Sequence, residues 1–205
     1  MKYRFKALEW NGLKGTIGEH LARSFIRTVL APRLAQEEGW DHVVLSHNDY
    51  KHQAKKPSQK LFKFDRYRED FMGHGVYATS RLLARYADAV GTLLKNHCTP
   101  DGLLLKLRET GSVTRLKARA CPLGTLSRVA ASQRHGDRVE LPVVDGALEI
   151  VEIKCGRAAK LVGKQKSAYN DLIAKDVPLR MIKVRIVSFD LNRFLVEDHR
   201  YDRFL

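Results

Sequence analysis

The chain has 205 residues, of which 44% are hydrophobic and 29% are charged, and its 37 Lys and Arg against 23 Asp and Glu give a net charge of +14. This composition indicates a soluble, globular protein of one domain, and the excess of positive charge favours a polyanionic partner, most simply nucleic acid. No run of 18 apolar residues is present, so no transmembrane helix is expected, and the N-terminus lacks the apolar core of a signal peptide.

The three cysteines, Cys98, Cys121 and Cys155, are widely spaced and form no CxxC pair. This pattern predicts neither a disulfide framework nor a zinc site. We therefore expect a cytoplasmic protein with reduced thiols.

The first two thirds of the chain are predicted to be mostly helical. Ile17, Leu21 and Phe25 recur at helical spacing, and Pro32 is expected to end or kink their helix. The elements expected here are, in order, a helix from about residue 15, a strand at 41–46, a polar basic loop over 47–70, helices over 75–97 and 100–111, and helical pieces on either side of Pro122.

The last third is richer in strands. Two strand-like segments flank Asp145 and Gly146, a pair of residues that favours a hairpin turn. The elements expected here are strands over 137–144 and 148–154, a helix over 164–176, a strand over 179–190 and a further strand candidate over 192–198.

The strand LEIVEIK places an acid and a base on an otherwise apolar side. Leu148, Ile150, Glu152 and Lys154 point one way because strand side chains alternate. A half-buried charge is costly unless it is paired, so these two residues either form a structural salt bridge or take part in chemistry.

A two-residue turn at Asp145 and Gly146 would place Asp137 opposite Lys154, on the same face as Glu152. A three-residue loop would instead bring Glu140 opposite Glu152, but it would split the apolar residues between the two faces. We therefore favour Asp137 as the second acid. An Asp and a Glu at the open end of a hairpin suit Mg²⁺, and Lys154 would neutralise charge on a phosphate.

The run GD…VEIK resembles the signature of the PD-(D/E)XK nuclease superfamily, an acid followed after a spacer by acid-x-Lys. The resemblance implies an α/β fold with an αβββαβ restriction-endonuclease-like core, a mixed sheet and a largely helical insertion. In a single domain over 1–205, the core would cover about 12–48 and 136–190, and the insertion about 49–135. The proline that precedes the first acid in the superfamily is absent here, because His135 and Gly136 precede Asp137.

The segment QKSAY is similar to the QxxxY motif of RecB-like nucleases, including the exonucleases of CRISPR adaptation, and it assigns Gln165 and Tyr169 to the site. In KGTIGEH, either Glu19 or His20 would complete the metal site, with Glu19 slightly preferred. An iron–sulfur cluster, which many RecB-like relatives carry, is not expected with three cysteines. The resemblance implies these metal ligands: Glu19 or His20, Asp137, Glu152 and the carbonyl of Ile153.

These observations predict an Mg²⁺- or Mn²⁺-dependent deoxyribonuclease, an exonuclease or endonuclease that acts on DNA ends, single strands or branched DNA. Two alternatives stay open: an inactive nuclease fold that only binds nucleic acid, and an RNA or junction nuclease with the same chemistry. A homodimer or a protein partner also stays possible. The residues expected to contact nucleic acid are Lys55, Lys56, Lys60, Lys63, Arg66, Arg81 and Arg85.

Overall fold

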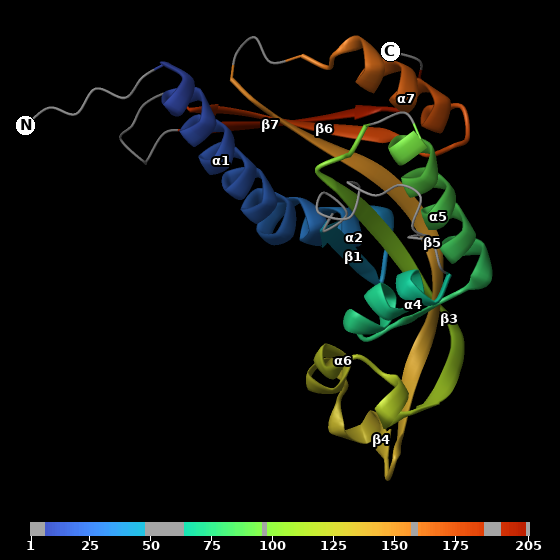
Figure 1. Cartoon of the computed structure of the whole chain (residues 1–205). Coiled ribbons are helices and arrows are strands. Elements are labelled where there is room, and N and C mark those ends of the chain that lie inside the picture. The colour runs from blue at the N-terminus through green and yellow to red at the C-terminus, as the bar shows by residue number, and fades with distance from the viewer. Residues whose placement is uncertain (1–6, 48–63, 96–97, 157–159, 187–193, 204–205) are drawn as a thin grey trace, which may run out of the picture.

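The computed structural model describes residues 7–47, 64–95, 98–156, 160–186 and 194–203 as an α/β fold around one mixed sheet (Figure 1). The helices are α1 (Ala7–Phe25), the π-helix η1 (Ile26–Leu30), α2 (Ala31–Glu38), α4 (Phe64–Gly73), α5 (Ser80–Lys95), α6 (Leu123–Arg128), α7 (Gly163–Ile173) and the 3₁₀ turns η2 (Ala118–Ala120) and η3 (Ala131–Gln133). The strands are β1 (His42–His47), β2 (Tyr77–Ala78), β3 (Gly102–Lys117), β4 (Arg134–His135), β5 (Arg138–Cys155), β6 (Leu179–Ile186) and β7 (Phe194–Tyr201).

The sheet runs in the order β1-β3-β5-β6-β7, and the short strands β2 and β4 both pair with β5. The pairs β1–β3, β3–β5 and β6–β7 are antiparallel, whereas β5 and β6 are parallel and are connected through α7. A parallel pair needs a crossover connection, and the helix predicted after residue 163 supplies it. The expected α/β class with a mixed sheet is therefore confirmed.

Helices cover both faces of the sheet, and two hydrophobic cores result (Figure 1). Leu148 and Ile150 of β5 pack under α4, α5 and α7, while the alternate residues Val151 and Ile153 pack under α1, η1 and α2. The alternation of side chains along β5 thus serves both layers. None of the described helices is both long enough and apolar enough to cross a membrane.

One fully buried acid lies among the strands on the α1 side of the sheet. Glu149 contacts Lys106 of β3 at 2.8 Å and Arg180 of β6 at 2.5 Å, and both cations are about 4% exposed. Lys106 also reaches Glu38 of α2 at 2.9 Å, and Arg180 reaches Asp198 of β7 at 2.5 Å. Each buried charge is thus paired, as burial away from water requires.

The segment 100–111, predicted to be a helix, is the first part of β3. It pairs with β1 on one side and β5 on the other, so it is a central strand rather than part of an insertion. Its run of apolar residues, Leu103–Leu105 and Leu107, fills both cores, as is typical of a strand buried on both faces. The range 49–135 therefore includes a strand of the sheet besides the helices α4 and α5. Of the pieces expected around Pro122, only the short helix α6 and the 3₁₀ turns η2 and η3 are helical.

The predicted hairpin turn at Asp145 and Gly146 is wrong, because β5 runs through these residues without a break. Lys106 and Leu107 of β3 lie so close that a Cβ on Gly146 would overlap the carbonyl oxygen of Lys106. The glycine therefore serves a close approach of two strands rather than a turn. The turn lies instead at Gly136, with φ +61°, and Asp137, between β4 and β5.

Pro32 does not end the first helix. The chain passes through the π-helical turn η1, in which the N–H of Ala31 donates to the carbonyl of Ile26, and then continues as α2. Proline has no N–H and is tolerated in the first turn of a helix. In place of the expected kink, the helix changes from α to π and back to α, and α2 then ends before Gly39, which has φ 68°.

We expect Gly146→Ala to lower the free energy of unfolding by about 2 kcal/mol or more, because the added methyl group would force β3 and β5 apart. Urea unfolding followed by circular dichroism measures this change. Gly91→Ala in α5 is the matched control: nothing lies within 4 Å of its added Cβ, so it should stabilise by about 0.5–1 kcal/mol. Equal stability of Gly146→Ala and wild type would contradict the close approach.

Candidate active site

Two acids from neighbouring strands meet at the start of β3. Asp101 directly precedes β3, and its N–H donates to the carbonyl of Val151 at 3.0 Å. Its side-chain Oδ2 accepts a hydrogen bond from the N–H of Ile153 at 2.7 Å. Because Gly102 pairs with Val151, the register places Asp101 beside Glu152. The carboxylate that accompanies Glu152 and Lys154 is therefore Asp101.

The side chain of Glu152 is 3% exposed and is held by three donors. Its Oε1 accepts from Lys154 Nζ at 2.6 Å and from Gln165 Nε2 at 2.8 Å, and its Oε2 accepts from the hydroxyl of Tyr169 at 2.5 Å. Gln165 and Tyr169 come from successive turns of α7, four residues apart, so both face the strand. The side chains of Gln165 and Tyr169 therefore contact Glu152 directly and do not point to the protein surface.

Burial raises the pKa of Glu152 above its ordinary range, and the nearby carboxylate of Asp101 raises it further, while Lys154 and Tyr169 act in the opposite direction. Burial and the charge of Glu152 likewise raise the pKa of Tyr169, so this phenol stays protonated and remains a donor. Two acids beside one lysine leave a site that favours an additional cation or a proton.

Glu19 and His20, the two candidates on α1, line different pockets. Glu19 lines a pocket of about 430 Å³ at the end of the sheet, together with Asp101 and residues that follow Glu152 on β5. His20 lines a different pocket of about 450 Å³. The first pocket is lined by Gly15, Glu19, Asp101, Ile153, Lys154, Cys155 and Lys160. Only Glu19 therefore joins the acids of the site.

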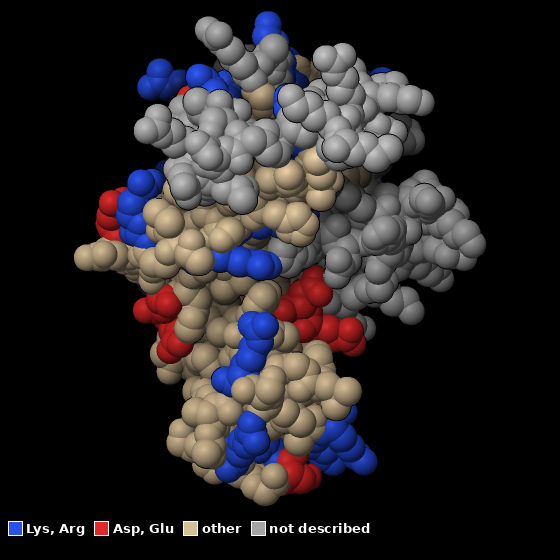
Figure 2. Space-filling view, turned by 90° about the vertical axis from the view of Figure 1, so that its left-hand side faces the viewer, with Lys and Arg blue, Asp and Glu red and all other residues tan. Residues whose placement is uncertain are grey.

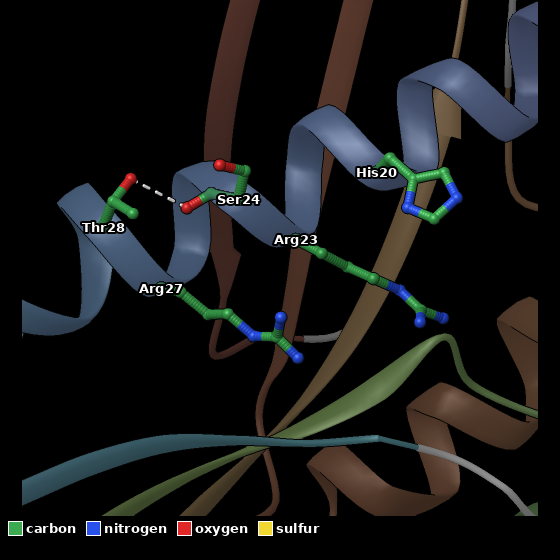
Figure 3. A pocket seen from close by; sticks show the side chains of 5 residues that line it. All are labelled: His20, Arg23, Ser24, Arg27 and Thr28. Carbon is green, nitrogen blue, oxygen red and sulfur yellow. Dashed lines mark hydrogen bonds between the residues drawn. The ribbon is translucent and has the colours of Figure 1, made fainter.

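The second pocket carries positive charge along α1 and η1. Figure 3 shows His20, Arg23 and Arg27 extending from one side of this helix. Arg23 also contacts Glu19 at 2.5 Å, so one ion pair connects the acid pocket with the basic one. Ser24 and Thr28 complete the lining, and the Thr28 hydroxyl donates to the carbonyl of Ser24 at 2.9 Å.

Helix α1 reaches the site because Gly18 allows it to lie close to β5. The thiol of Cys155 contacts the carbonyl of Gly15 at 3.7 Å, and a Cβ on Gly18 would overlap its sulfur. Cys155 thus sets how closely α1 approaches β5.

The expected acid Asp137 does not belong to this site. It is exposed in the turn between β4 and β5, and the fourteen residues of extended chain between it and Glu152 span tens of ångströms. Glu140, the alternative, pairs with Arg115 at 2.5 Å on the same distant part of β5. Neither acid can share a ligand with Glu152.

The residues expected to contact nucleic acid are only partly described. Arg81 is exposed in the first turn of α5, and the half-buried Arg85 donates to the carbonyl of Gly146 at 3.3 Å. Outside the described part of the structure lie Lys55, Lys56, Lys60, Lys63 and the side chain of Arg66.

The donor set allows a test of whether a divalent metal fits. Among the described residues, no group of three or more His, Cys, Asp and Glu side chains lies ready to hold an ion. Mg²⁺, however, takes only one or two carboxylates and completes its shell with water and main-chain carbonyls. Asp101, Glu152 and the carbonyl of Ile153 are hard oxygen donors of this kind. Burial and the nearby Asp101 carboxylate both raise the pKa of Glu152, and a cation would relieve the repulsion between the two acids. The residues therefore fit the metal.

Pro100 and Asp101 form the dipeptide that sequence reasoning missed. The signal was present as a proline and an acid directly before the run GLLLKL. A short apolar run bounded by such residues is typical of a buried strand as much as of a helix. The helical interpretation hid the acid, because it placed Asp101 in a helix turn far from the sheet.

Comparison of the chain with protein-family models, curated proteins and solved structures finds no match, so the site is interpreted from its own geometry.

We expect Gly18→Ala to destabilise the protein by about 1–3 kcal/mol, since the added methyl group overlaps the sulfur of Cys155. Thermal unfolding measures the change. In the double variant Gly18→Ala/Cys155→Ala the overlap with sulfur is removed, so most of the lost stability should return. A double variant no more stable than Gly18→Ala would contradict this packing of α1 on β5.

The raised pKa of Glu152 has a consequence for stability. The folded protein holds this proton more tightly than the unfolded chain, so the stability contributed by Glu152 falls as the pH rises above about 4.5. We expect Glu152→Gln to gain stability over wild type between pH 5 and pH 7 and to lose that gain at lower pH. Urea unfolding across this pH range measures the difference.

Glu140→Gln is the control of opposite sign. Arg115 holds the pKa of Glu140 below its ordinary range, so the charged form contributes stability that is present at neutral pH and lost on acidification. Removing this exposed charge should cause a small loss at pH 7. A gain for Glu152→Gln that does not depend on pH would show that packing, not charge, is responsible.

Proposed function

We propose that the chain is a divalent-metal-dependent nuclease of the PD-(D/E)XK type that hydrolyses the phosphodiester bonds of DNA. The observation that carries this proposal is the meeting of Pro100–Asp101, at the start of β3, with Glu152-Ile153-Lys154 on the adjacent strand. Pro100 and Asp101 would thereby supply both the first acid and the proline, which is absent before Asp137.

The order of the elements supports the same proposal. With the elements inserted between them set aside, the order is a helix, three antiparallel strands, a crossover helix and a parallel strand, namely α1, β1, β3, β5, α7 and β6. This is the αβββαβ order of a restriction-endonuclease-like core. The acids lie on the two central strands, and α1 and α7 flank the end of β5 that carries them (Figure 1).

Asp101, Glu152 and the carbonyl of Ile153 would hold Mg²⁺ or Mn²⁺, with Glu19 close enough to assist through water. When bound, such a metal polarises the phosphate and lowers the pKa of a water molecule. The remaining chemistry belongs to the side chains of this protein, and each has a contact that fits its role.

Lys154 is the group that would stabilise negative charge developing on the phosphate. Its Nζ lies 2.6 Å from Glu152 Oε1 and 3.3 Å from Gln165 Oε1, so it is held at the border of the pocket. A cation fixed in a partly buried site stabilises a transition state better than a mobile one, because it needs no reorganisation. Gln165 and Tyr169 act as positioning residues, since they orient the carboxylate of Glu152.

A binding module without catalysis is the second candidate, and one observation favours it. Both oxygens of Glu152 already accept hydrogen bonds from within the protein, and no cluster of three acidic, His or Cys ligands exists among the described residues. In that case the basic surface would hold nucleic acid without cutting it. RNA and branched DNA are alternative substrates for the same chemistry.

We expect Asp101→Asn to reduce metal-dependent cleavage of end-labelled DNA by at least about 100-fold, and Glu152→Gln and Lys154→Ala to do the same. The matched control is Asp137→Asn, the same substitution in the turn between β4 and β5, which should cut at the wild-type rate. The assay compares single-stranded, duplex and branched DNA and RNA with Mg²⁺, Mn²⁺ or EDTA.

Loss of cleavage in Asp137→Asn together with retention in Asp101→Asn would contradict the proposed site. Nucleic-acid binding by the wild type without metal-dependent cleavage of any substrate would favour the binding module instead. Circular dichroism of each variant separates loss of activity from loss of folding.

A further inference from the structure

Strands β3 and β5 continue well beyond the part of the sheet that carries the site. β1 pairs only with residues 102–107 of β3, and β6 pairs only with residues 150–155 of β5. Farther along, residues 113–117 pair with 138–142, and α6, η3 and β4 close the end. We call residues 110–142 the arm, which forms the lower end of the molecule in Figure 1.

The arm has a hydrophobic core of its own. Val139 and Leu141 of β5 pack with Cys121, Val129 and Met72, and Leu116 and Leu126 cover this cluster from the side. The side chains on the opposite side of the ladder, among them Arg115, Lys117, Arg138 and Glu140, are therefore turned outward. Substitutions on the outward side leave the core of the arm intact.

Positive charge dominates the arm. It contains six Lys and Arg but only two acids, Asp137 and Glu140. Glu140 pairs with Arg115 at 2.5 Å, and Arg134 donates to the carbonyls of Leu126 and Val129. One acid and two cations thus make contacts within the arm, and the net charge of the arm remains positive.

Three cations of the arm have a different environment. Lys117 lies directly opposite Arg138 in the β3–β5 ladder, and His135 of β4 also pairs with Arg138. Lys117, Arg119 and Arg138 are exposed, and no acid within the described ranges forms an ion pair with any of them. Like charges directly opposite one another destabilise a sheet. An arrangement that costs stability in the free protein suggests a ligand that compensates it.

We propose that the arm binds the phosphate backbone of a nucleic-acid duplex, more than one helical turn away from the phosphate that is cleaved. This inference rests on the proposed function and adds a second contact to it. Glu152 lies fourteen residue steps after Arg138 along β5, or roughly 45 Å, which corresponds to about 13 base pairs of duplex at 3.4 Å each.

Charge and shape favour a phosphate backbone over a small anion or an acidic protein. The three cations lie on an open surface rather than in a pocket, and in Figure 2 blue side chains appear over the lower end of the molecule with little red among them. Regularly spaced phosphates neutralise such a surface without requiring shape complementarity. A straight duplex held at the site also reaches the arm, so binding to both requires no energy for bending the duplex.

The test measures how affinity depends on substrate length. The variant Lys117→Ala/Arg119→Ala/Arg138→Ala and the wild type are titrated, in EDTA to prevent cleavage, with fluorescent duplexes of about 8 and about 30 base pairs. We expect the variant to bind the long duplex at least about 10-fold more weakly and the short one within about two-fold of wild type. The slope of log affinity against log salt for the long duplex should fall by about 2 to 3, one contact for each cation removed.

The control removes the same charge elsewhere. Arg33, Lys175 and Arg185 each already pair with an acid, at 3.7, 3.2 and 2.9 Å, and their triple alanine variant should bind the long duplex almost as the wild type does. An equal loss on both duplex lengths, or in both triple variants, would attribute the effect to net charge and overturn the inference.

Wild-type affinity of the arm variant for the long duplex would also overturn it. Because binding is measured without metal, these outcomes are independent of cleavage. A loss of affinity in the arm variant that depends on duplex length supports binding by the arm, even if the wild type cleaves no substrate. If the wild type cleaves DNA but the arm variant binds both duplexes as the wild type does, only this inference is refuted. Tight binding of a single strand but not of a duplex would likewise refute the duplex.

Discussion

The close approach of β3 and β5 at Gly146 is the constraint on which the rest of the structure depends. With no side chain at this position, the carbonyl of Lys106 can lie against the backbone of β5, and the two strands pair with their register unbroken from Gly102 to Glu109. That register brings Asp101 beside Glu152 and Lys106 beside Glu149. It also lets β5 run on as one strand, so that the site and the arm occupy opposite ends of a single rigid element.

Local patterns predicted the elements that are decided locally. The helix that carries Glu19, the strand of Glu152 and Lys154, and the helix of Gln165 and Tyr169 were all expected, because periodicity and spacing are properties of short segments. The predicted pairing of 137–144 with 148–154 in a hairpin was wrong, because both segments belong to β5, which pairs with β3. Asp-Gly favours a turn in isolation, and only the position of Lys106, forty residues earlier, makes Gly146 a strand residue. Asp101 was missed because the apolar run after it was interpreted as a helix, and only its pairing with β5, about fifty residues later in the chain, identifies it as a strand.

The arrangement of charges at the candidate active site lowers the stability of the folded protein. Glu152 is buried beside a second carboxylate, and three donors from β5 and α7 only partly offset that cost. The opposite face of the same strand handles burial differently. Glu149, three residues earlier, has a cation on each side, and its pKa is held below the ordinary range despite burial. One strand thus carries one acid neutralised for structure and one left short of positive charge.

The buried trio of Lys106, Glu149 and Arg180 has a consequence for how this sequence can change. Each member comes from a different strand, and removal of any one leaves an uncompensated charge in the interior. A single substitution is therefore costly at each of the three positions, while simultaneous replacement of all three by apolar residues is tolerable. In a set of diverged sequences with this fold, we expect these positions to be exchanged together or not at all, which would reveal the order β3-β5-β6 without any structure.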